Sequence, residues 1–145
     1  MMKKLVVLAL LCVVPLLASC DTLLNLLQPN QDTVRLVNNG SFDIQVTVVT
    51  SDNQLVTQDL LDSPGATTQY TIAAGQTQTF TRSCSQLQAI RIKDAELLVI
   101  GQVGPHTSSD VFRDGTDFHC GATLTFTFQH SALLLDFNET FAASR

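Results

Sequence analysis

The chain has no tryptophan, a single tyrosine and few charged residues, which make up 14% of its 145 positions. Basic residues are scarce, with eight Lys and Arg against 13 Asp and Glu. Nucleic acids and anionic lipids are bound chiefly through clustered Lys and Arg side chains. This charge balance therefore excludes nucleic acid as an expected partner and argues against attachment to a membrane by charge.

The sequence also lacks an apolar run long enough to cross a bilayer as a helix. Its longest run covers residues 5–17 and is interrupted by Pro15, whereas a spanning helix needs roughly 20 apolar residues. Lys3 and Lys4 precede this run, and small residues follow it. A positive start, a short apolar stretch and small residues are the three regions of a cleaved secretory signal peptide. We therefore predict that the protein is exported and loses this leader.

Recognisable catalytic motifs are missing as well, because the chain contains no HExxH, GxSxG or CxxC pattern. Three histidines and three aspartates gather late in the chain: His106, His119, His130, Asp110, Asp114 and Asp117. An envelope hydrolase using His106 or His119 with one of these aspartates is an alternative function. Because no spacing among these residues matches a known site, we expect no enzyme activity and no catalytic, cofactor-binding or metal site.

The end of the leader carries the most specific motif of the chain. Leu17-Ala18-Ser19-Cys20 resembles the lipobox of bacterial lipoprotein precursors, which signal peptidase II cuts just before the cysteine. The resemblance covers residues 1–20 only. It implies that residues 1–19 are removed and that Cys20 is the site of lipid attachment, through palmitate and other acyl chains. The alternative is an ordinary cleaved signal with an incidental thiol.

The resemblance also implies a location. Two or more acyl chains hold a protein stably on a membrane. We therefore expect a lipid-anchored protein of the bacterial cell envelope, on either the inner or the outer membrane, with its domain in the periplasm or outside the cell.

Cysteine use after processing leaves one pair. Cys12 departs with the leader and Cys20 becomes the anchor, so Cys84 and Cys120 remain. An exported chain with one remaining pair is expected to form a disulfide, which would stabilise the fold by roughly 4 kcal/mol on the chain-entropy model. Two free thiols or metal ligands are the alternative, disfavoured because neither cysteine has a nearby Cys partner.

Residues 20–32 are the expected lipidated tether. Their leucines at positions 23–27 would form one apolar helical turn on the lipid surface, stopped before Pro29, or belong to a disordered spacer. Removal of the leader with Lys3 and Lys4 would leave six of the eight basic residues and all 13 acidic ones, so the mature chain would have a formal charge of −7. The remaining residues 33–145 have the size of one domain.

From Thr33 onward, apolar residues tend to recur at every second position, the period of a half-buried strand. The predicted strands are 34–36, 42–48, 55–61, 67–72, 77–82, 90–93, 97–100, 123–128 and 133–137. A helix over 87–100 is rejected because its β-branched residues fit a pleated surface and no capping residues bracket it. Seven to nine short strands predict an all-β, antiparallel immunoglobulin-like β-sandwich.

The stretch from Gly101 to Asp117 is the longest without a strand pattern, and loops of this length in compact domains are often functional. We expect a non-catalytic binding or structural module that acts through residues 101–117 on an envelope protein or a glycan. Asp110 to Asp117 superficially resembles a calcium loop, but its spacing departs from that of an EF-hand. A turn at Asp114-Gly115 is the simpler interpretation. A small-ligand carrier is a further alternative, which would require an internal apolar cavity.

Overall fold

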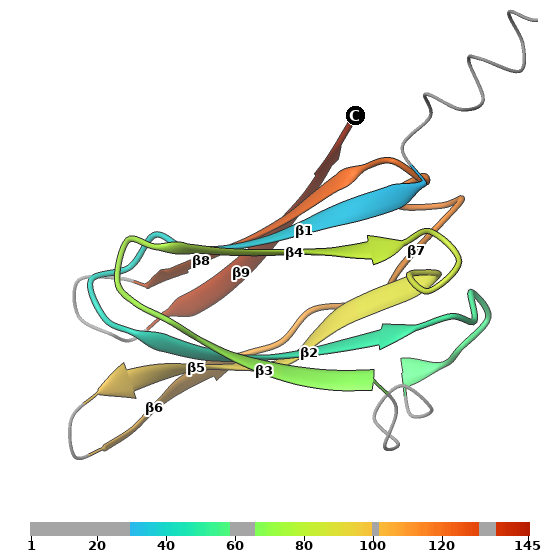
Figure 1. The fold of residues 1–145 in the computed structure, drawn as a ribbon. Helices are drawn as coiled ribbons and strands as arrows, with labels where there is room; N and C mark the ends of the chain where they lie inside the picture. Colours follow the sequence, from blue (N-terminus) through green and yellow to red (C-terminus); the bar gives the residue numbers. More distant parts are fainter. Residues whose placement is uncertain (1–29, 59–65, 100–101, 131–135) are drawn as a thin grey trace, which may run out of the picture.

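A computed structural model describes residues 30–58, 66–99, 102–130 and 136–145, which form two facing β-sheets (Figure 1). One sheet has the strand order β4-β1-β8-β9, and the other has the order β3-β2-β5-β6, with β7 also paired to β5. The strands are β1 (Gln31–Asn38), β2 (Ile44–Ser51), β3 (Ala66–Ile72), β4 (Thr77–Ser83), β5 (Ala89–Val99), β6 (Gln102–Thr107), β7 (Phe112–Arg113), β8 (Thr123–His130) and β9 (Phe137–Ser144). The predicted all-β sandwich is confirmed.

The alternating pattern of the sequence builds the core. Val34 and Leu36 of β1 lie fully buried beside Leu124, Phe126 and Phe128 of β8. Burial of each such side chain stabilises the fold by roughly 1.5–3 kcal/mol. The intervening positions of both strands face outward, since successive side chains of a strand point to opposite faces. The strongest sequence signals thus correspond to the middle of the four-stranded sheet.

One pair of strands departs from the antiparallel prediction. β1 and β8 run parallel, with Thr33 opposite Thr123 and Val37 opposite Thr127, whereas the other strand pairs are antiparallel. Alternation along a strand reports which face is buried but carries no information about the direction of its neighbour. The relative direction of two strands so distant in sequence depends on the path of the whole chain.

The predicted strand, turn and strand around Ala73 to Gln76 exist, but the two strands belong to different sheets. β3 pairs with β2, and β4 pairs with β1. The turn between them is closed by a hydrogen bond from the Gln76 N–H to the Ala73 carbonyl at 3.0 Å, with Gly75 at φ 68°. From this turn β3 and β4 diverge along one side of the sandwich (Figure 1).

The break predicted near Asp94 is a β-bulge within one long strand, β5. Thr47 of β2 faces Asp94, while the next residue, Val48, faces Ile92, so that Lys93 is the extra residue. The bulge shifts the inward positions of β5 from Ile92 to Ala95, both of which are fully buried. Without this extra residue, one half of the strand would turn its apolar side chains outward.

The prediction that residues 101–117 form a loop is wrong in the described part, which contains strands β6 and β7. Gly104 and Pro105 were expected to mark a loop, but both lie in β6, an edge strand where the missing N–H of proline is tolerated. The two residues together oppose Leu97 in an irregular register. A Cβ at Gly104 would lie 1.8 Å from the Leu97 carbonyl oxygen, so this glycine allows close approach of two strands.

Two further strand predictions are corrected. Leu55 to Thr57 lie outside the strands, and residues 59–61 are outside the described part. Val56 packs in a small apolar cluster with Val49 and Ala89, which explains the apolar residue at this position. The last strand, predicted at 133–137, begins at Phe137 and continues through the expected polar tail to Ser144, while residues 131–135 are not described. An edge strand with one solvent-facing side needs few apolar residues.

Candidate functional site

The predicted leader, lipobox and lipid attachment at Cys20, and most of the predicted tether, fall on residues 1–29, outside the described residues. The chain becomes defined at Asn30 and enters β1 at Gln31, before the expected boundary at Thr33. The Asn30 carbonyl accepts a hydrogen bond from the Cys84 N–H at 3.2 Å. We call this end of the sandwich the tether end.

The Cys84–Cys120 disulfide lies at the tether end, as predicted, with an S–S distance of 1.97 Å and a Cα–Cα distance of 5.3 Å. Cys84 directly follows β4, and Cys120 precedes β8. These two strands flank β1 on either side. The disulfide therefore joins the two neighbours of the first strand at the point where the tether reaches the sheet.

Asp32 is a buried carboxylate at the same end that the sequence interpretation placed in the tether. Its Oδ1 accepts hydrogen bonds from the N–H groups of Gly121 and Ala122 at 2.8 and 3.1 Å, and no part of the residue is exposed. Burial raises the pKa of Asp32, with a smaller contribution from the Asp114 charge, whereas the two backbone hydrogen bonds lower it. Asp32 lies two positions before Val34 and four before Leu36, so the alternation of the sequence could have predicted that it points inward.

An open cleft of about 740 Å³ lies at the tether end, where β3 and β4 have diverged. Polar side chains dominate its lining, which consists of Gln31, Thr50, Ser51, Asp52, Ala66, Thr81, Arg82, Ser83 and Gln86. We call this feature the β3/β4 cleft. Its polar, open character does not match the enclosed apolar cavity that a carrier of apolar ligands requires.

Arg82 is the only cation among the described residues that line the β3/β4 cleft. Its guanidinium lies 5.2 Å from the centroid of the Phe80 ring, and its Nη1 donates to the Thr81 carbonyl at 3.1 Å. Phe80 in turn stacks on Tyr70, with ring centroids 5.3 Å apart. Among the described residues no carboxylate forms an ion pair with Arg82. Sequence reasoning missed this site because its parts come from four strands and their connections.

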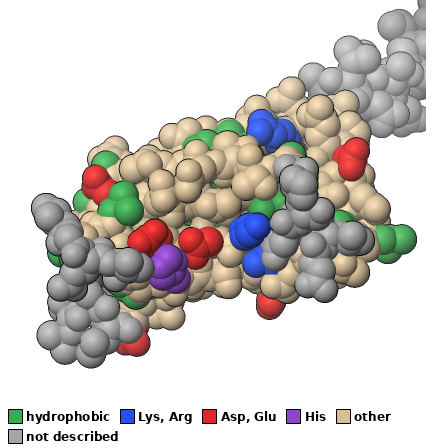
Figure 2. Space-filling model, turned by 90° about the horizontal axis from the view of Figure 1, so that it is seen from below, with side chains coloured by type: hydrophobic (Ala, Val, Ile, Leu, Met, Phe, Trp, Pro, Cys, Tyr) green, Lys and Arg blue, Asp and Glu red, His purple; other side chains and the backbone are tan. Residues whose placement is uncertain are grey.

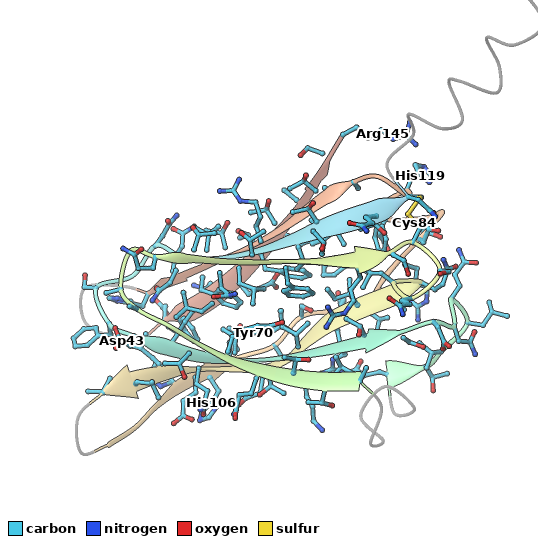
Figure 3. The ribbon with its side chains drawn as sticks, in the orientation of Figure 1. Asp43, Tyr70, Cys84, His106, His119 and Arg145 are labelled. Atoms are coloured by element: carbon cyan, nitrogen blue, oxygen red, sulfur yellow. A yellow bond between two sulfur atoms is a disulfide. The ribbon has the colours of Figure 1, made fainter. Side chains whose placement is uncertain are left out.

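The structure separates the three histidines that were considered for catalysis. His106 lies on the outer face of the five-stranded sheet, and His119 lies at the tether end (Figure 3). His130, at the end of β8, accepts a hydrogen bond at Nε2 from the Ser41 N–H at 2.8 Å. A site combining these histidines is therefore not formed.

His106 contacts two carboxylates, neither of which comes from the expected loop. Its Nδ1 lies 3.0 Å from Asp94 Oδ1, and its Nε2 lies 4.0 Å from Glu96 Oε1. The side chains of His106 and Asp94 are 46% and 48% exposed. Figure 2, which views this face, shows a histidine flanked by acidic side chains on an open surface. The pair has an acid–base geometry, and both side chains are open to solvent.

The aspartates of residues 110–117 serve the local turn. Asp114 Oδ1 accepts from the Gly115 N–H at 3.0 Å, and Asp117 Oδ2 accepts from the Arg113 N–H at 2.7 Å. Gly115 has a φ of 78°, in the left-handed region that favours glycine. The predicted Asp114-Gly115 turn before Phe118 is confirmed. Within the described ranges, no three His, Cys, Asp or Glu side chains are placed to hold a metal ion.

Glu139 is a second carboxyl group with a raised pKa. It occupies an inward position on the edge strand β9, and its Oε1 is buried without a hydrogen-bond partner. Burial raises its pKa, and the nearby Asp110 charge adds to the effect.

The end opposite the tether, which we call the distal end, is held by polar side chains. The Asn38 amide contacts the carbonyls of Phe42, Ile72 and Ala73 at 2.8–3.1 Å. Asp43 Oδ1 accepts from the Ala74 N–H at 3.0 Å. Figure 3 shows Asp43 at the opposite end of the sandwich from Cys84 and His119. The turns of the distal end are thus fixed relative to both sheets.

No described helix has the length and apolarity needed to cross a membrane. No family model matches the chain, and no curated protein matches it significantly.

Several solved structures resemble it at low identity. The human-specific toxin intermedilysin is 11% identical over 79% of this chain and 24% of the toxin, with a TM-score of 0.46. The T6SS lipoprotein TssJ1 from Pseudomonas aeruginosa is 10% identical over 81% of this chain and 98% of TssJ1, with a TM-score of 0.44. Listeriolysin O is 8% identical over 79% of this chain and 23% of the toxin, with a TM-score of 0.43. The chain thus spans about a quarter of the length of these toxins, and the similarity concerns the arrangement of strands.

Proposed function

We propose that this chain is a lipid-anchored protein of the bacterial cell envelope that acts as a non-catalytic binding or structural module. The observation that carries the proposal is the construction of the tether end. β1, the first strand after the tether, lies between β4 and β8, whose ends are joined by the Cys84–Cys120 disulfide.

This construction suits a domain held by its N-terminus. Force applied through the tether would act along β1, which forms hydrogen-bonded ladders with a neighbour on each side. Both ladders would have to shear together, and the disulfide prevents the two neighbours from separating.

The distal end is the surface that an anchored module presents away from its membrane. Its turns are fixed by Asn38, Asp43 and His130, and Phe42 remains 37% exposed there, with its ring 5.5 Å from that of His130. Rigid turns at the end of a sandwich are common recognition surfaces. In place of residues 101–117, which contain strands, we propose the distal end as the contact surface for an envelope partner.

The anchor is tested by metabolic labelling with an alkyne analogue of palmitate, followed by membrane fractionation. The parent protein should incorporate label and sediment with membranes, and Cys20→Ala should abolish the labelling. Cys12→Ala is the matched control, because this cysteine precedes the proposed cleavage site and its loss should leave labelling intact. An unlabelled parent protein, or labelling that survives Cys20→Ala, would refute the anchored function.

A hydrolase is the second candidate, because the His106 imidazole lies within hydrogen-bond distance of a carboxylate. Its discriminating experiment is a panel of ester, glycoside and peptide substrates assayed with the parent protein and with His106→Ala. The non-catalytic proposal expects no turnover by either. Activity in the parent that is lost in His106→Ala would instead establish an enzyme.

A further inference from the structure

We propose that the β3/β4 cleft binds a saccharide that carries a carboxylate, with Arg82 as its anion-binding residue. This inference deepens the proposed binding function by assigning a ligand class to a second surface, at the tether end. It starts from a half-buried cation in a chain whose charge is predominantly acidic.

Among the described residues, no acidic side chain forms an ion pair with Arg82. Arg82 stands opposite Asp32 in the β1–β4 register, and both side chains point toward the sandwich interior. Asp32, however, accepts its hydrogen bonds from the Gly121 and Ala122 backbone, and Arg82 instead lies over the Phe80 ring. Asp52 also lines the cleft without forming an ion pair with Arg82. A partly desolvated charge is costly unless it is paired, so an anionic ligand would supply the missing partner.

The guanidinium retains donors for such a ligand. Its one hydrogen bond within the described residues runs from Nη1 to the Thr81 carbonyl, and a guanidinium has five N–H donors arranged in a planar fork. That fork matches the two oxygens of a carboxylate. The contact of the guanidinium with the Phe80 ring restricts the Arg82 side chain before a ligand arrives, which reduces the entropy lost on binding.

The remaining lining indicates a hydroxylated ligand. Most of the described lining residues are polar: Thr50, Ser51, Thr81 and Ser83 are hydroxyl-bearing residues, and Gln31 and Gln86 are amide-bearing residues. These groups both donate and accept hydrogen bonds, as the hydroxyls of a sugar do. Among the described residues of the lining, Ala66 is the only apolar one, so this part of the lining favours a hydroxylated ligand over the apolar side chains of a peptide. A volume of about 740 Å³ lies within the range of small-molecule sites.

The test measures binding by titration calorimetry with the full-length protein as purified. If the purified protein carries lipid, it is held in phosphatidylcholine nanodiscs. Sugar detergents are avoided because they could occupy the cleft. The probes are two acidic disaccharides, N-acetylglucosaminyl-N-acetylmuramic acid and digalacturonic acid, each with its carboxyl-reduced neutral form. The tighter acid identifies the source of the carboxylate. An acidic pentapeptide represents the competing ligand class.

We expect at least one acid to bind about tenfold or more tightly than its neutral form, because one charge-assisted contact contributes a factor of this size. Arg82→Gln should remove that preference. Arg35→Gln, on the exposed outer face of the neighbouring strand β1, should preserve it. Ser83→Ala, which leaves the charge in place, should weaken the acid and its neutral form alike, and it keeps the test open if Arg82→Gln unfolds.

Four results would overturn the proposal: no binding of either acid at millimolar concentration, equal binding of acid and neutral forms, a preference that survives Arg82→Gln, or tighter binding of the peptide. This readout does not depend on acylation. If no ligand binds, the anchored function is still decided by the Cys20 labelling experiment. If the protein is not labelled, the saccharide proposal is still decided by the calorimetric titration.

Discussion

Loss of the Cys84–Cys120 disulfide should lower the melting temperature by more than a typical core substitution does. The two cysteines are 36 positions apart, and closing a loop of this length restricts the unfolded chain by about 13 cal/mol/K, or roughly 4 kcal/mol at 25 °C. The roughly 116 residues from Asn30 to Arg145 have an unfolding entropy of about 0.24 kcal/mol/K. The expected shift is therefore about 16 °C.

The measurement compares thermal unfolding of the parent with that of Cys84→Ser/Cys120→Ser, both under non-reducing conditions. Adding reductant should lower the parent to nearly the level of the variant and leave the variant unchanged, which controls for the substitutions themselves. Hydrogen exchange adds a local readout. The Gly121 and Ala122 N–H groups, which donate hydrogen bonds to Asp32 Oδ1, should exchange faster in the variant. The Leu98 N–H at the distal end, which donates to the Asp43 carbonyl, should change less.

A shift below about 5 °C would refute this reasoning, because it would mean that the bond hardly restricts the unfolded chain. Equal acceleration of exchange at both ends would refute the local part. It would show that the disulfide stabilises the sandwich as a whole and does not specifically hold the strands that flank β1.

Two further predictions concern the edge strands. Because burial raises the pKa of Glu139 above its ordinary value of 4.5, the stabilising contribution of its protonated form is fully present below about pH 4.5 and is lost as the pH rises through the raised pKa. Glu139→Gln should therefore stabilise the protein at pH 7 by about 1 kcal/mol. Glu96→Gln, the control, should not stabilise it. Equal melting temperatures of the parent and Glu139→Gln at pH 7 would contradict the raised pKa of Glu139. Gly104→Ala should destabilise the fold by roughly 1–3 kcal/mol in urea unfolding, since the added Cβ would overlap the Leu97 carbonyl, and an unchanged midpoint would show that β6 can move away at little cost.

The edge strands explain where prediction from the sequence failed. Gly104 and Pro105 are ordinary loop markers, and only the partner strand reveals that one permits close approach and the other occupies an unpaired edge. The bulge at Lys93 was visible as a change of phase in the apolar pattern. Whether such a phase change ends a strand or inserts one residue depends on the neighbouring strand.

At the candidate site, too, some features could be predicted from the sequence and others could not. The disulfide could be predicted because, once the lipobox accounts for Cys20, counting cysteines leaves a single pair. The β3/β4 cleft could not, because it exists only where two strands that adjoin in sequence enter different sheets. Arg82 lies two positions after Phe80 on the same face of β4, a spacing found in any strand. Its lack of an ion pair among the described residues follows because Asp32, which it faces across the register, accepts hydrogen bonds from another segment.

By itself, the sequence determined the cysteine pair and the strands whose alternating side chains specify a buried face, and it predicts a short leader with a lipobox-like end. Tertiary structure decided everything that depends on neighbours. It made β1 and β8 parallel, placed the disulfide between the two strands that flank β1, buried Asp32, and opened a polar cleft beside an arginine that has no ion pair among the described residues. The physical reason is that periodicity is a local property of the chain, whereas pairing, burial of charge and clefts arise from contacts between segments distant in sequence.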